Sequence, residues 1–345
     1  MIRRQQRRTS RTAERLALRR GARVGVVPRT IDVLYVSPHA DDVAFSAAGQ
    51  IARDRAAGLR VAVMTLFEAK EGMAEFSDAA RKEEDARFAR LAGIEMVQAG
   101  FADAIVRKAA YRWTPMIFAP VGAAESALVA SIRTALQRFV YARGCTRVVA
   151  PLGVGGHVDH QVAHLACRDL YGAHVSFYED TPYVLTDYQL ARRLSRLGVA
   201  PTLADAADRT VVRGTMREEL GAAAETWNTA PFIVDRVRPS LRAAAVATIL
   251  SPEVLAWPRR EQNLPRRLVS TIVDDPAIAE AKLAAIACYA SQWPFYHRDL
   301  GGWANSLERY AIAMGRSRIV ERTWTLEPER AHAHAATSAS IARAA

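Results

Sequence analysis

Two short polar motifs hold the residue types that could carry chemistry. Residues 37–42 (SPHADD) follow a short apolar run, and residues 157–160 (HVDH) follow another. A divalent metal needs several deprotonated ligands from one side, and His39 and Asp42 could supply two of them while His160 supplies the third. Three protein ligands leave a coordination position open, which is the arrangement of a catalytic zinc site whose bound water has its pKa lowered to about 7.

Three further side chains in these motifs could act on such a water or on a substrate. Asp41 stands next to a proposed ligand without being one, so it is free to take a proton as a general base. His157 could polarise an oxyanion or protonate a leaving amine as an imidazolium, with Asp159 nearby to orient it. Each motif also has a plainer explanation, because an Asp-Asp pair after a strand is often a helix N-cap and a His-x-Asp-His sequence can be an ordinary polar loop.

The elements that must position these motifs alternate between strand and helix. Apolar runs rich in β-branched residues lie at 32–36, 60–67, 96–101, 147–152 and 174–178, and helical spacing of apolar residues lies between them. This alternation predicts an α/β fold, a Rossmann-like three-layer αβα arrangement with a mostly parallel sheet. Because ligands bind outside the carboxyl ends of parallel strands, both motifs should meet at one edge of the sheet.

The chain beyond Asp180 is less regular. Helical stretches at 188–197, 217–224 and 277–289 are interrupted by short β-like runs such as 268–273. We predict that this region forms C-terminal helical cover on the same sheet. The predicted α/β domain then spans 31–330, with a core of βα units at 31–180 and a substrate-recognition region at 181–330. Residues 331–345, rich in Ala, Ser and His, are predicted to be a frayed tail.

Composition and charge exclude several classes. Half of the residues are hydrophobic and 24% are charged, which is typical of a globular chain. The net charge is +11, but residues 1–30 contain ten Arg and one Glu, so the rest of the chain is close to neutral. This basic segment has no aromatic residue on which a base could stack, and we predict a disordered leader with no specific nucleic-acid partner.

The expected location follows from what the sequence lacks. No run is long and apolar enough for a membrane span, and no secretory signal is readable. Three well-separated cysteines fit a reducing compartment, and we therefore predict a cytoplasmic protein. A homo-oligomer is left open by the sequence.

The two motifs resemble those of the PIG-L/LmbE-like zinc-dependent N-acetylglucosaminyl deacetylases. Residues 38–42 (PHADD) resemble the (A/S)-H-x-D-D signature of that family, and residues 157–160 resemble its H-x-D-H signature. The resemblance implies Zn2+, with Fe2+ or another divalent ion as a substitute, on the same three ligands proposed above. It implies Asp41 as general base, His157 in transition-state stabilisation or acid catalysis, and removal of an N-acetyl or other N-acyl group from an amino sugar.

Other similarities imply residues that contact the substrate. Residues 81–85 (RKEED) resemble a family helix whose Arg81 could reach the polar head of a substrate, although charge pairs on a solvated helix face explain this run equally well. Asp103 follows the third strand, where relatives place a substrate-facing acid, and a loop cap is the alternative. Glu179 and Asp180 follow the fifth strand, where carboxylates could bind a hydroxyl-rich substrate or cap a turn.

Three other classes of function compete with this interpretation. A nucleotide-binding Rossmann protein would need G-x-G-x-x-G after the first strand, where this chain has acids that repel a pyrophosphate. A catalytically silent sugar-binding relative is disfavoured because the full set of motif residues is present. An amidase acting on a non-sugar natural-product amide is the main alternative, because Val43 stands where the better-known sugar deacetylases have Glu.

Overall fold

The computed structural model describes residues 30–68, 78–112, 114–185, 187–197, 266–293, 296–297 and 299–328. The basic segment up to residue 29, the predicted helix at 217–224 and the predicted tail lie outside the described residues. At the start of the described chain, the backbone N–H of Thr30 donates to the carbonyl of Arg143 at 2.9 Å.

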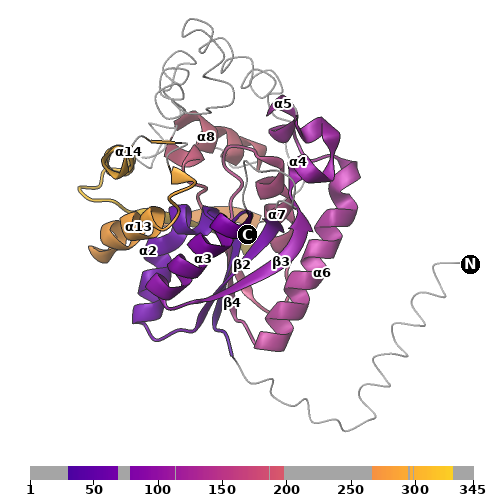
Figure 1. Cartoon of the computed structure of the whole chain (residues 1–345), viewed down its shortest axis with the longest axis horizontal. Helices are drawn as coiled ribbons and strands as arrows, with labels where there is room; N and C mark the ends of the chain where they lie inside the picture. Colours follow the sequence, from indigo (N-terminus) through magenta and orange to yellow (C-terminus); the bar gives the residue numbers. More distant parts are fainter. Residues whose placement is uncertain are drawn as a thin grey trace, which may run out of the picture.

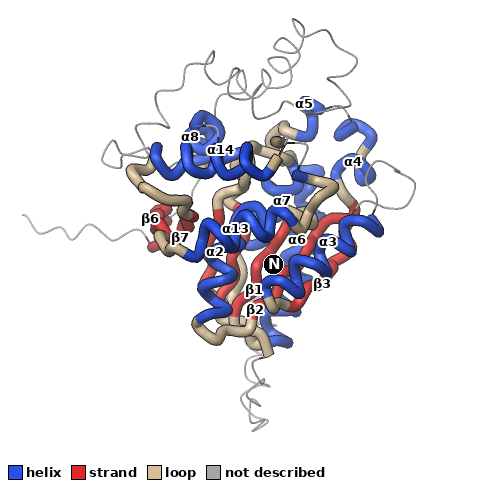
Figure 2. The backbone as a smooth tube through the Cα atoms, turned by 60° about the vertical axis from the view of Figure 1, so that its left-hand side comes forward, coloured by secondary structure: helices blue, strands red, loops and turns tan. Residues whose placement is uncertain are grey.

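A seven-stranded sheet, in the order β3-β2-β1-β4-β5-β7-β6, forms the centre of the molecule. The five N-terminal strands pair parallel with one another, and β7 pairs antiparallel with both β5 and β6. Figure 2 shows β6 and β7 at the opposite side of the sheet from β3. The strands are β1 (Val33–Ser37), β2 (Val61–Glu68), β3 (Glu95–Ala102), β4 (Arg147–Pro151), β5 (His174–Tyr178), β6 (Arg266–Val273) and β7 (Glu321–Pro328).

Helices cover both faces of the sheet, and Figure 1 shows α2, α3 and α13 on the side opposite α6. The long helices are α2 (Asp42–Ala56), α3 (Asp78–Ala92), α6 (Ser126–Arg143), α7 (Val158–Cys167), α8 (Asp187–Arg196), α13 (Ala277–Ala287) and α14 (Leu300–Ala313). Short turns complete the described elements: α4 (Ala104–Arg107), α5 (Thr114–Ile117), η1 (Ala109–Arg112), η2 (Ala123–Glu125) and η3 (Tyr183–Leu185). The sequence-based prediction of a three-layer α/β fold is confirmed.

Strand β1 shows why the sheet is buried on both sides. Leu34 and Val36 pack into the core formed with α6 and α7, whereas Val33 and Tyr35 pack into the core formed with α2 and α13. Every residue of β1 is buried. A continuous apolar run of this kind is what a central parallel strand requires, because both of its faces lie against helices.

The C-terminal region differs in one respect from the helical cover that we predicted. It supplies helical cover as expected, with α8 and α13 at two of the predicted stretches and α14 outside them, but it also adds β7 and β6 to the edge of the sheet beside β5. The run at 268–273 is part of β6, whereas β7 was not predicted because it begins with Glu321 and Arg322. Both side chains are buried with partners of opposite charge, so their charge does not mark an exposed segment.

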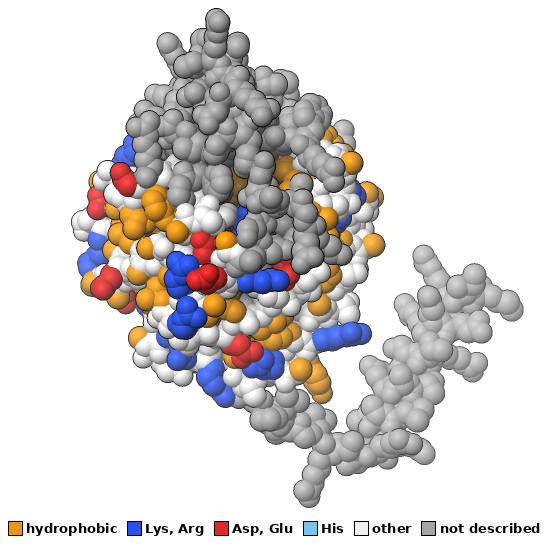
Figure 3. Space-filling model, in the orientation of Figure 1, with side chains coloured by type: hydrophobic (Ala, Val, Ile, Leu, Met, Phe, Trp, Pro, Cys, Tyr) orange, Lys and Arg blue, Asp and Glu red, His pale blue; other side chains and the backbone are white. Residues whose placement is uncertain are grey.

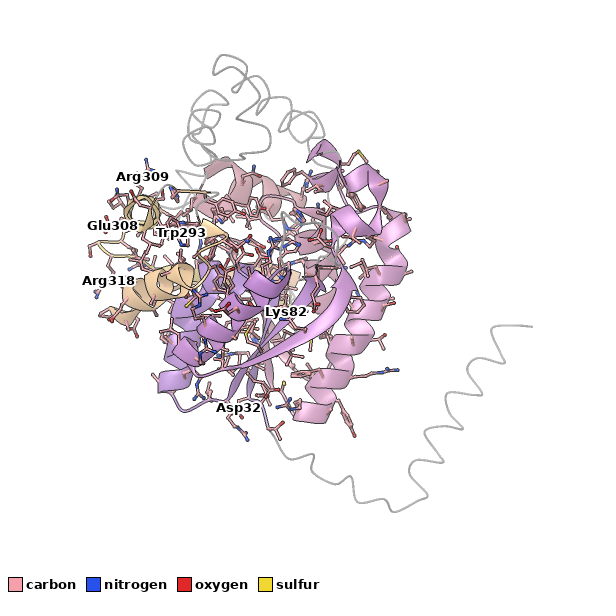
Figure 4. All side chains as sticks on the ribbon, viewed as in Figure 1. Asp32, Lys82, Trp293, Glu308, Arg309 and Arg318 are labelled. Carbon is pink, nitrogen blue, oxygen red and sulfur yellow. The ribbon has the colours of Figure 1, made fainter. Side chains whose placement is uncertain are left out.

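The described surface carries mixed charge. In Figure 3, basic and acidic side chains are interspersed with apolar ones on the visible described face. Glu308 and Arg309 project outward from α14 in Figure 4. None of the described helices combines the length and apolarity needed to cross a membrane.

Helices α2 and α13 touch at a glycine. A Cβ atom at Gly49 would lie 2.7 Å from Cγ2 and 3.0 Å from Cβ of Ile278, a stiff β-branched side chain. We expect Gly49→Ala to destabilise the protein by about 1–3 kcal/mol through overpacking, only partly offset by the ~1 kcal/mol higher helix propensity of Ala. Urea unfolding measures this cost.

The control is the same substitution in an Ile278→Ala background. The two shortest contacts, with Cγ2 and Cγ1, are then absent and only the 3.0 Å approach to Cβ is left, so Gly49→Ala should destabilise the protein much less. An equal cost in both backgrounds would show that the contact between α2 and α13 is not its origin.

Candidate metal centre and active site

Both polar motifs and the residues after β5 lie at the carboxyl ends of three adjacent strands. The loop after β1 carries His39, Asp41 and Asp42, and the loop after β4 leads into α7 with His160 in its first turn. Asp180 follows β5, which pairs with β4. The predicted convergence at one edge of the sheet is therefore what the structure shows.

Three of these side chains form a compact set of metal-ligand atoms. One carboxylate oxygen of Asp42, Oδ2, lies 3.1 Å from Nδ1 of His39 and 3.3 Å from Nε2 of His160. The three ligand atoms lie within 4.8 Å of one another. Two imidazole nitrogens and one carboxylate oxygen suit Zn2+ or Fe2+, so the residues fit the ion that the motifs imply.

The outward-facing nitrogen of each histidine is bonded to a buried carboxylate. Nδ1 of His160 lies 2.7 Å from Oδ1 of Asp180, and Nε2 of His39 lies 3.2 Å from Oδ2 of Asp159. A carboxylate accepts, so each of these nitrogens carries the proton and the other nitrogen is left with a lone pair directed at the shared cluster. Metal-ligating histidines are held by carboxylates in this way.

Local backbone contacts fix the loop after β1. The backbone N–H of His39 donates to Oδ2 of Asp42 at 2.7 Å. The hydroxyl of Ser37 donates to the carbonyl of His39 and accepts the backbone N–H of Val43 at 3.1 Å. Asp41 occupies the N-cap position of α2, but its side chain makes no capping hydrogen bond. Helix capping therefore does not explain why position 41 carries a carboxylate.

The neighbouring carboxylates Asp41 and Asp42 have different electrostatic surroundings. Burial and the charge of Asp42 raise the pKa of Asp41 to about 6, although Arg81 and His39 oppose this shift. Burial alone would raise the pKa of Asp42 too, but His160 and His39 outweigh it and lower that pKa to about 2. Asp42 is thus held as an anion, as a proposed metal ligand must be, whereas the raised pKa of Asp41 suits a group that exchanges a proton near neutral pH.

His157 lies beside the cluster as a neutral ring. It forms the N-cap of α7, where its Nδ1 accepts the backbone N–H of Asp159 at 3.3 Å. Its ring meets that of His39 edge-on, with 5.1 Å between centroids. Burial lowers the pKa of His157 to about 3, with the charge of His39 adding to the effect. The imidazolium that we predicted is not favoured, and the proton of the neutral ring is on Nε2.

Asp159 has a different role from the one we predicted. Its carboxylate is fully buried and accepts the backbone N–H of Ala104 at 3.0 Å and Nη2 of Arg107 at 2.8 Å, in addition to its contact with His39. A second grouping of possible ligands contains His39, His157 and this carboxylate. We favour the cluster around Asp42, because the oxygens of Asp159 already accept these donors. Asp159 therefore orients His39, not His157.

Two predicted substrate-binding residues lie near the cluster. Oδ2 of Asp103 is 3.6 Å from Nε2 of His39, while its Oδ1 also caps α4 by accepting the N–H of Ile105. Arg81 on α3 is near enough to Asp41 to lower its pKa, and its guanidinium donates to Oε1 of Gln292 at 2.9 Å. The loop cap and the contact near the cluster are thus both present at Asp103.

The structure contradicts the predicted substrate role of Glu179 and Asp180. The Asp180 carboxylate, 1% exposed, accepts the backbone N–H groups of Gly153 at 2.7 Å and Val154 at 2.8 Å besides its bond to His160. Glu179 is also buried, and accepts from Arg322 at 2.6 Å, from the indole N–H of Trp324 at 2.7 Å and from the Tyr310 hydroxyl. Neither carboxylate has an exposed face with which to bind a ligand.

Sequence reasoning missed the aromatic side chains that surround the cluster. The Tyr183 ring is 5.7 Å from that of His160, and the Phe118 ring is 5.9 Å from that of His157. Burial, with the charges of Asp41 and Asp42, raises the pKa of Tyr296, which places this tyrosine near the same carboxylates. Tyr183 follows β5 within the run YEDTPY, which is a usable sequence signal, but Tyr296 lies in an irregular segment between α13 and α14.

The comparisons with known proteins agree with this geometry. A family model described as PIG-L, GlcNAc-PI de-N-acetylase, matches residues 34–171, which carry all three proposed ligands. Over this region the chain is similar to the PIG-L family. The 2'-N-acetylparomamine deacetylase of Streptomyces fradiae is 36% identical over 171 residues. That match covers 44% of this chain and 57% of the relative, so it spans little more than half of the relative's length.

Solved structures share the fold over a longer stretch. The A40926 pseudoaglycone deacetylase has a TM-score of 0.54 at 18% identity, covering 87% of this chain and 98% of that chain. A zinc-inhibited form of teicoplanin deacetylase has a TM-score of 0.57 at 17% identity, covering 87% and 99%. The likeness therefore includes the C-terminal region that the family model does not match.

The contacts of Asp180 predict how its substitution would change zinc affinity. We expect Asp180→Asn to weaken zinc binding by about 10–100-fold, because a neutral amide lacks the negative charge with which the carboxylate holds the Nδ1–H of His160. Competition with a chromophoric chelator measures this affinity. Glu179→Gln is the matched control, since Glu179 is equally buried but faces Tyr310 and Arg322. Unchanged zinc affinity in Asp180→Asn would remove its assigned role.

Proposed function

We propose that this protein is a metal-dependent N-deacetylase that removes an acetyl or other acyl group from the amine of an amino sugar or sugar-containing metabolite. The observation that carries the proposal is the cluster of His39, Asp42 and His160, with a second acid, Asp41, beside it and outside the ligand set. The PIG-L match and the deacetylase from Streptomyces fradiae support this class of reaction.

The ligand atoms would be Nδ1 of His39, a carboxylate oxygen of Asp42 and Nε2 of His160. A divalent ion held there, Zn2+ or Fe2+, supplies Lewis acidity toward the amide carbonyl and lowers the pKa of water. Asp159 and Asp180 keep the two imidazoles in the tautomers that face this position. The preorganised ligands and their buried partners are the contribution of the chain to binding the ion.

Asp41 is the proton carrier in the proposed reaction. As a carboxylate it takes one proton from the water that attacks the amide carbon, and the oxygen of that water forms the new C–O bond. When the C–N bond breaks, the same carboxylic acid returns the proton to the leaving nitrogen, so that the products are a carboxylic acid and a free amine. A pKa near 6 suits both transfers.

His157 stabilises the developing oxyanion in this proposal. Its Nδ1 already accepts from the backbone of α7, so its Nε2–H is the group available to donate. A neutral imidazole N–H can stabilise an oxyanion without carrying a full charge into a buried site next to His39. The acid role that the family resemblance implied for His157 passes to Asp41, because burial disfavours the imidazolium.

Arg81 and Asp103 are retained as proposed substrate contacts, because both lie beside the cluster. The similar proteins are deacetylases of 2'-N-acetylparomamine, of the A40926 pseudoaglycone and of teicoplanin. These names support an amino-sugar substrate here without identifying it. A non-sugar amide is the competing substrate class, and the aromatic rings of Tyr183 and Tyr296 are the feature that could accommodate it.

The test of the function combines metal analysis with amine release. We expect about one divalent ion per chain by mass spectrometry, and release of a free amine from a panel of N-acetylated amino sugars. Asp41→Asn should keep its ion while kcat falls by roughly 10²–10⁴, the usual contribution of general-base catalysis. A fully active, metal-loaded Asp41→Asn enzyme would contradict the mechanism. Release from non-sugar amides alone would favour the competing substrate class.

Zinc binding should depend steeply on pH. Burial lowers the pKa of His39 and of His160, but their carboxylate partners outweigh it and raise both pKa values above the ordinary value for histidine. These carboxylates therefore favour an extra proton on each ring in the absence of an ion, and zinc must displace any proton on the nitrogen that faces the cluster. We expect zinc affinity to fall as pH falls, by up to about 100-fold per pH unit if two protons are displaced.

Calorimetry checks this expectation. Titration of the metal-free protein with Zn2+ in two buffers of different ionisation enthalpy gives the number of protons released. His160→Ala should release fewer protons and bind zinc more weakly. Affinity that is flat between about pH 6 and pH 8 would show that the two histidines are already neutral before zinc binds.

A further inference from the structure

Helix α2 is interrupted just after the residues that it contributes to the cluster. Ala47 has φ −134° and ψ 16°, which is not helical, within an otherwise helical run. The part before this break, Asp42–Ser46, begins with a proposed ligand and is preceded by the proposed base Asp41. The direction of this short first part therefore determines where both carboxylates lie.

Two side chains from the C-terminal region bind the backbone at the break. In a regular helix the N–H of Gln50 donates to the carbonyl of Ser46. Here the Ser46 carbonyl accepts Nζ of Lys282 at 2.9 Å, and the Gln50 N–H donates to Oε2 of Glu321 at 2.8 Å. Oε1 of Glu321 also accepts the N–H of Gly49 at 3.0 Å. The side chains thus occupy both halves of one helical hydrogen bond.

Lys282 and Glu321 also pair with each other. Nζ and Oε1 are 3.1 Å apart, and the residues are 2% and 3% exposed. A buried ion pair contributes little net stability compared with apolar residues of the same size, because both charges lose their hydration. Net stability alone therefore does not explain why this buried ion pair is present. Its contacts with the backbone at the break support a different role, which is to fix the geometry of α2 there.

Neighbouring contacts tie the same segment to the rest of the site. The hydroxyl of Ser46 accepts the backbone N–H of Thr181, the residue after Asp180, at 3.0 Å. Thr323 on β7 donates to Oε1 of Gln50 at 2.9 Å. The break in α2 is therefore held from β5 on one side and from α13 and β7 on the other.

We propose that Lys282 and Glu321 are positioning residues of the metal centre, holding α2 broken at Ala47 so that its first turn presents Asp41 and Asp42 to the cluster. This inference rests on the proposed metal-dependent function. Both residues lie outside the stretch 34–171 that the family model matches. The C-terminal region thus shapes the site through the backbone, without contributing a ligand.

Zinc affinity and thermal stability, measured together, test the proposal. Glu321→Gln and Lys282→Met each remove one charge from the break. We expect each to weaken zinc binding at least ~10-fold, the lower range for residues that orient metal ligands. Ile278→Val is the matched control, because it trims the same contact between α13 and α2 and leaves the hydrogen bonds at the break intact. Its zinc affinity should stay within about twofold of the wild type.

A double variant separates positioning from folding. Lys282→Met combined with Glu321→Leu removes both charges, so that the Ser46 carbonyl and the Gln50 N–H can pair with each other. We expect a melting temperature of the metal-free protein near that of the wild type, with zinc binding still at least ~10-fold weaker.

The outcomes of these measurements are distinct. A folded double variant that binds Zn2+ as tightly as the wild type would overturn the positioning role, as would single variants whose zinc affinity matches that of Ile278→Val. A wild-type protein that binds no Zn2+ or Fe2+ would overturn the proposed function itself, and this inference with it.

Discussion

The sharing of one Asp42 oxygen between two histidines is the interaction on which the rest of the site depends. That oxygen lies within 3.3 Å of both imidazoles, and each imidazole is backed by a second, deeply buried carboxylate. Several acids buried together at one sheet edge are unfavourable unless positive charge is supplied. Protonation of the two histidines, whose pKa values are raised, can supply it in the free chain, and a divalent ion can replace their protons. The same electrostatic demand thus explains the geometry and the affinity for a cation.

The supports of the cluster come from distant parts of the chain. Arg107, from the turn after β3, holds Asp159 and is itself 3.2 Å from the buried Glu125. Backbone N–H groups of the Gly-rich loop after β4 hold Asp180. Glu84 on α3 bonds to the C-terminal region, where it accepts both the N–H and the hydroxyl of Ser291. A site at a sheet edge is rigid only if the loops around it are bonded to one another in this way.

The sequence was sufficient to predict the parallel core and the convergence of the three proposed ligands at one sheet edge, because strand ends and metal-binding residue types are both readable from local patterns. It was not sufficient to predict the partners of Asp159, Glu179 and Asp180. An acid next to a proposed ligand can face the substrate or face inward, and for Glu179 and Asp159 the direction depends on residues more than a hundred positions away, Arg322 and His39. Strand β7 was missed for the same reason, since the buried partner of Glu321 is far away in the sequence.

The adjacent acids Asp41 and Asp42 show how position separates two identical side chains into different roles. Both are buried at the start of α2, so both lose hydration, and burial raises the pKa of each. Asp42 lies 3.1 Å from His39 and 3.3 Å from His160, and these two histidines favour its anionic form. Asp41 faces Arg81 less directly and the charge of Asp42 opposes its ionisation. Environments that push two neighbouring pKa values apart are how one site holds both a permanent anion and a proton carrier. The break at Ala47 influences both environments, because the direction of the first turn of α2 sets the positions of both carboxylates.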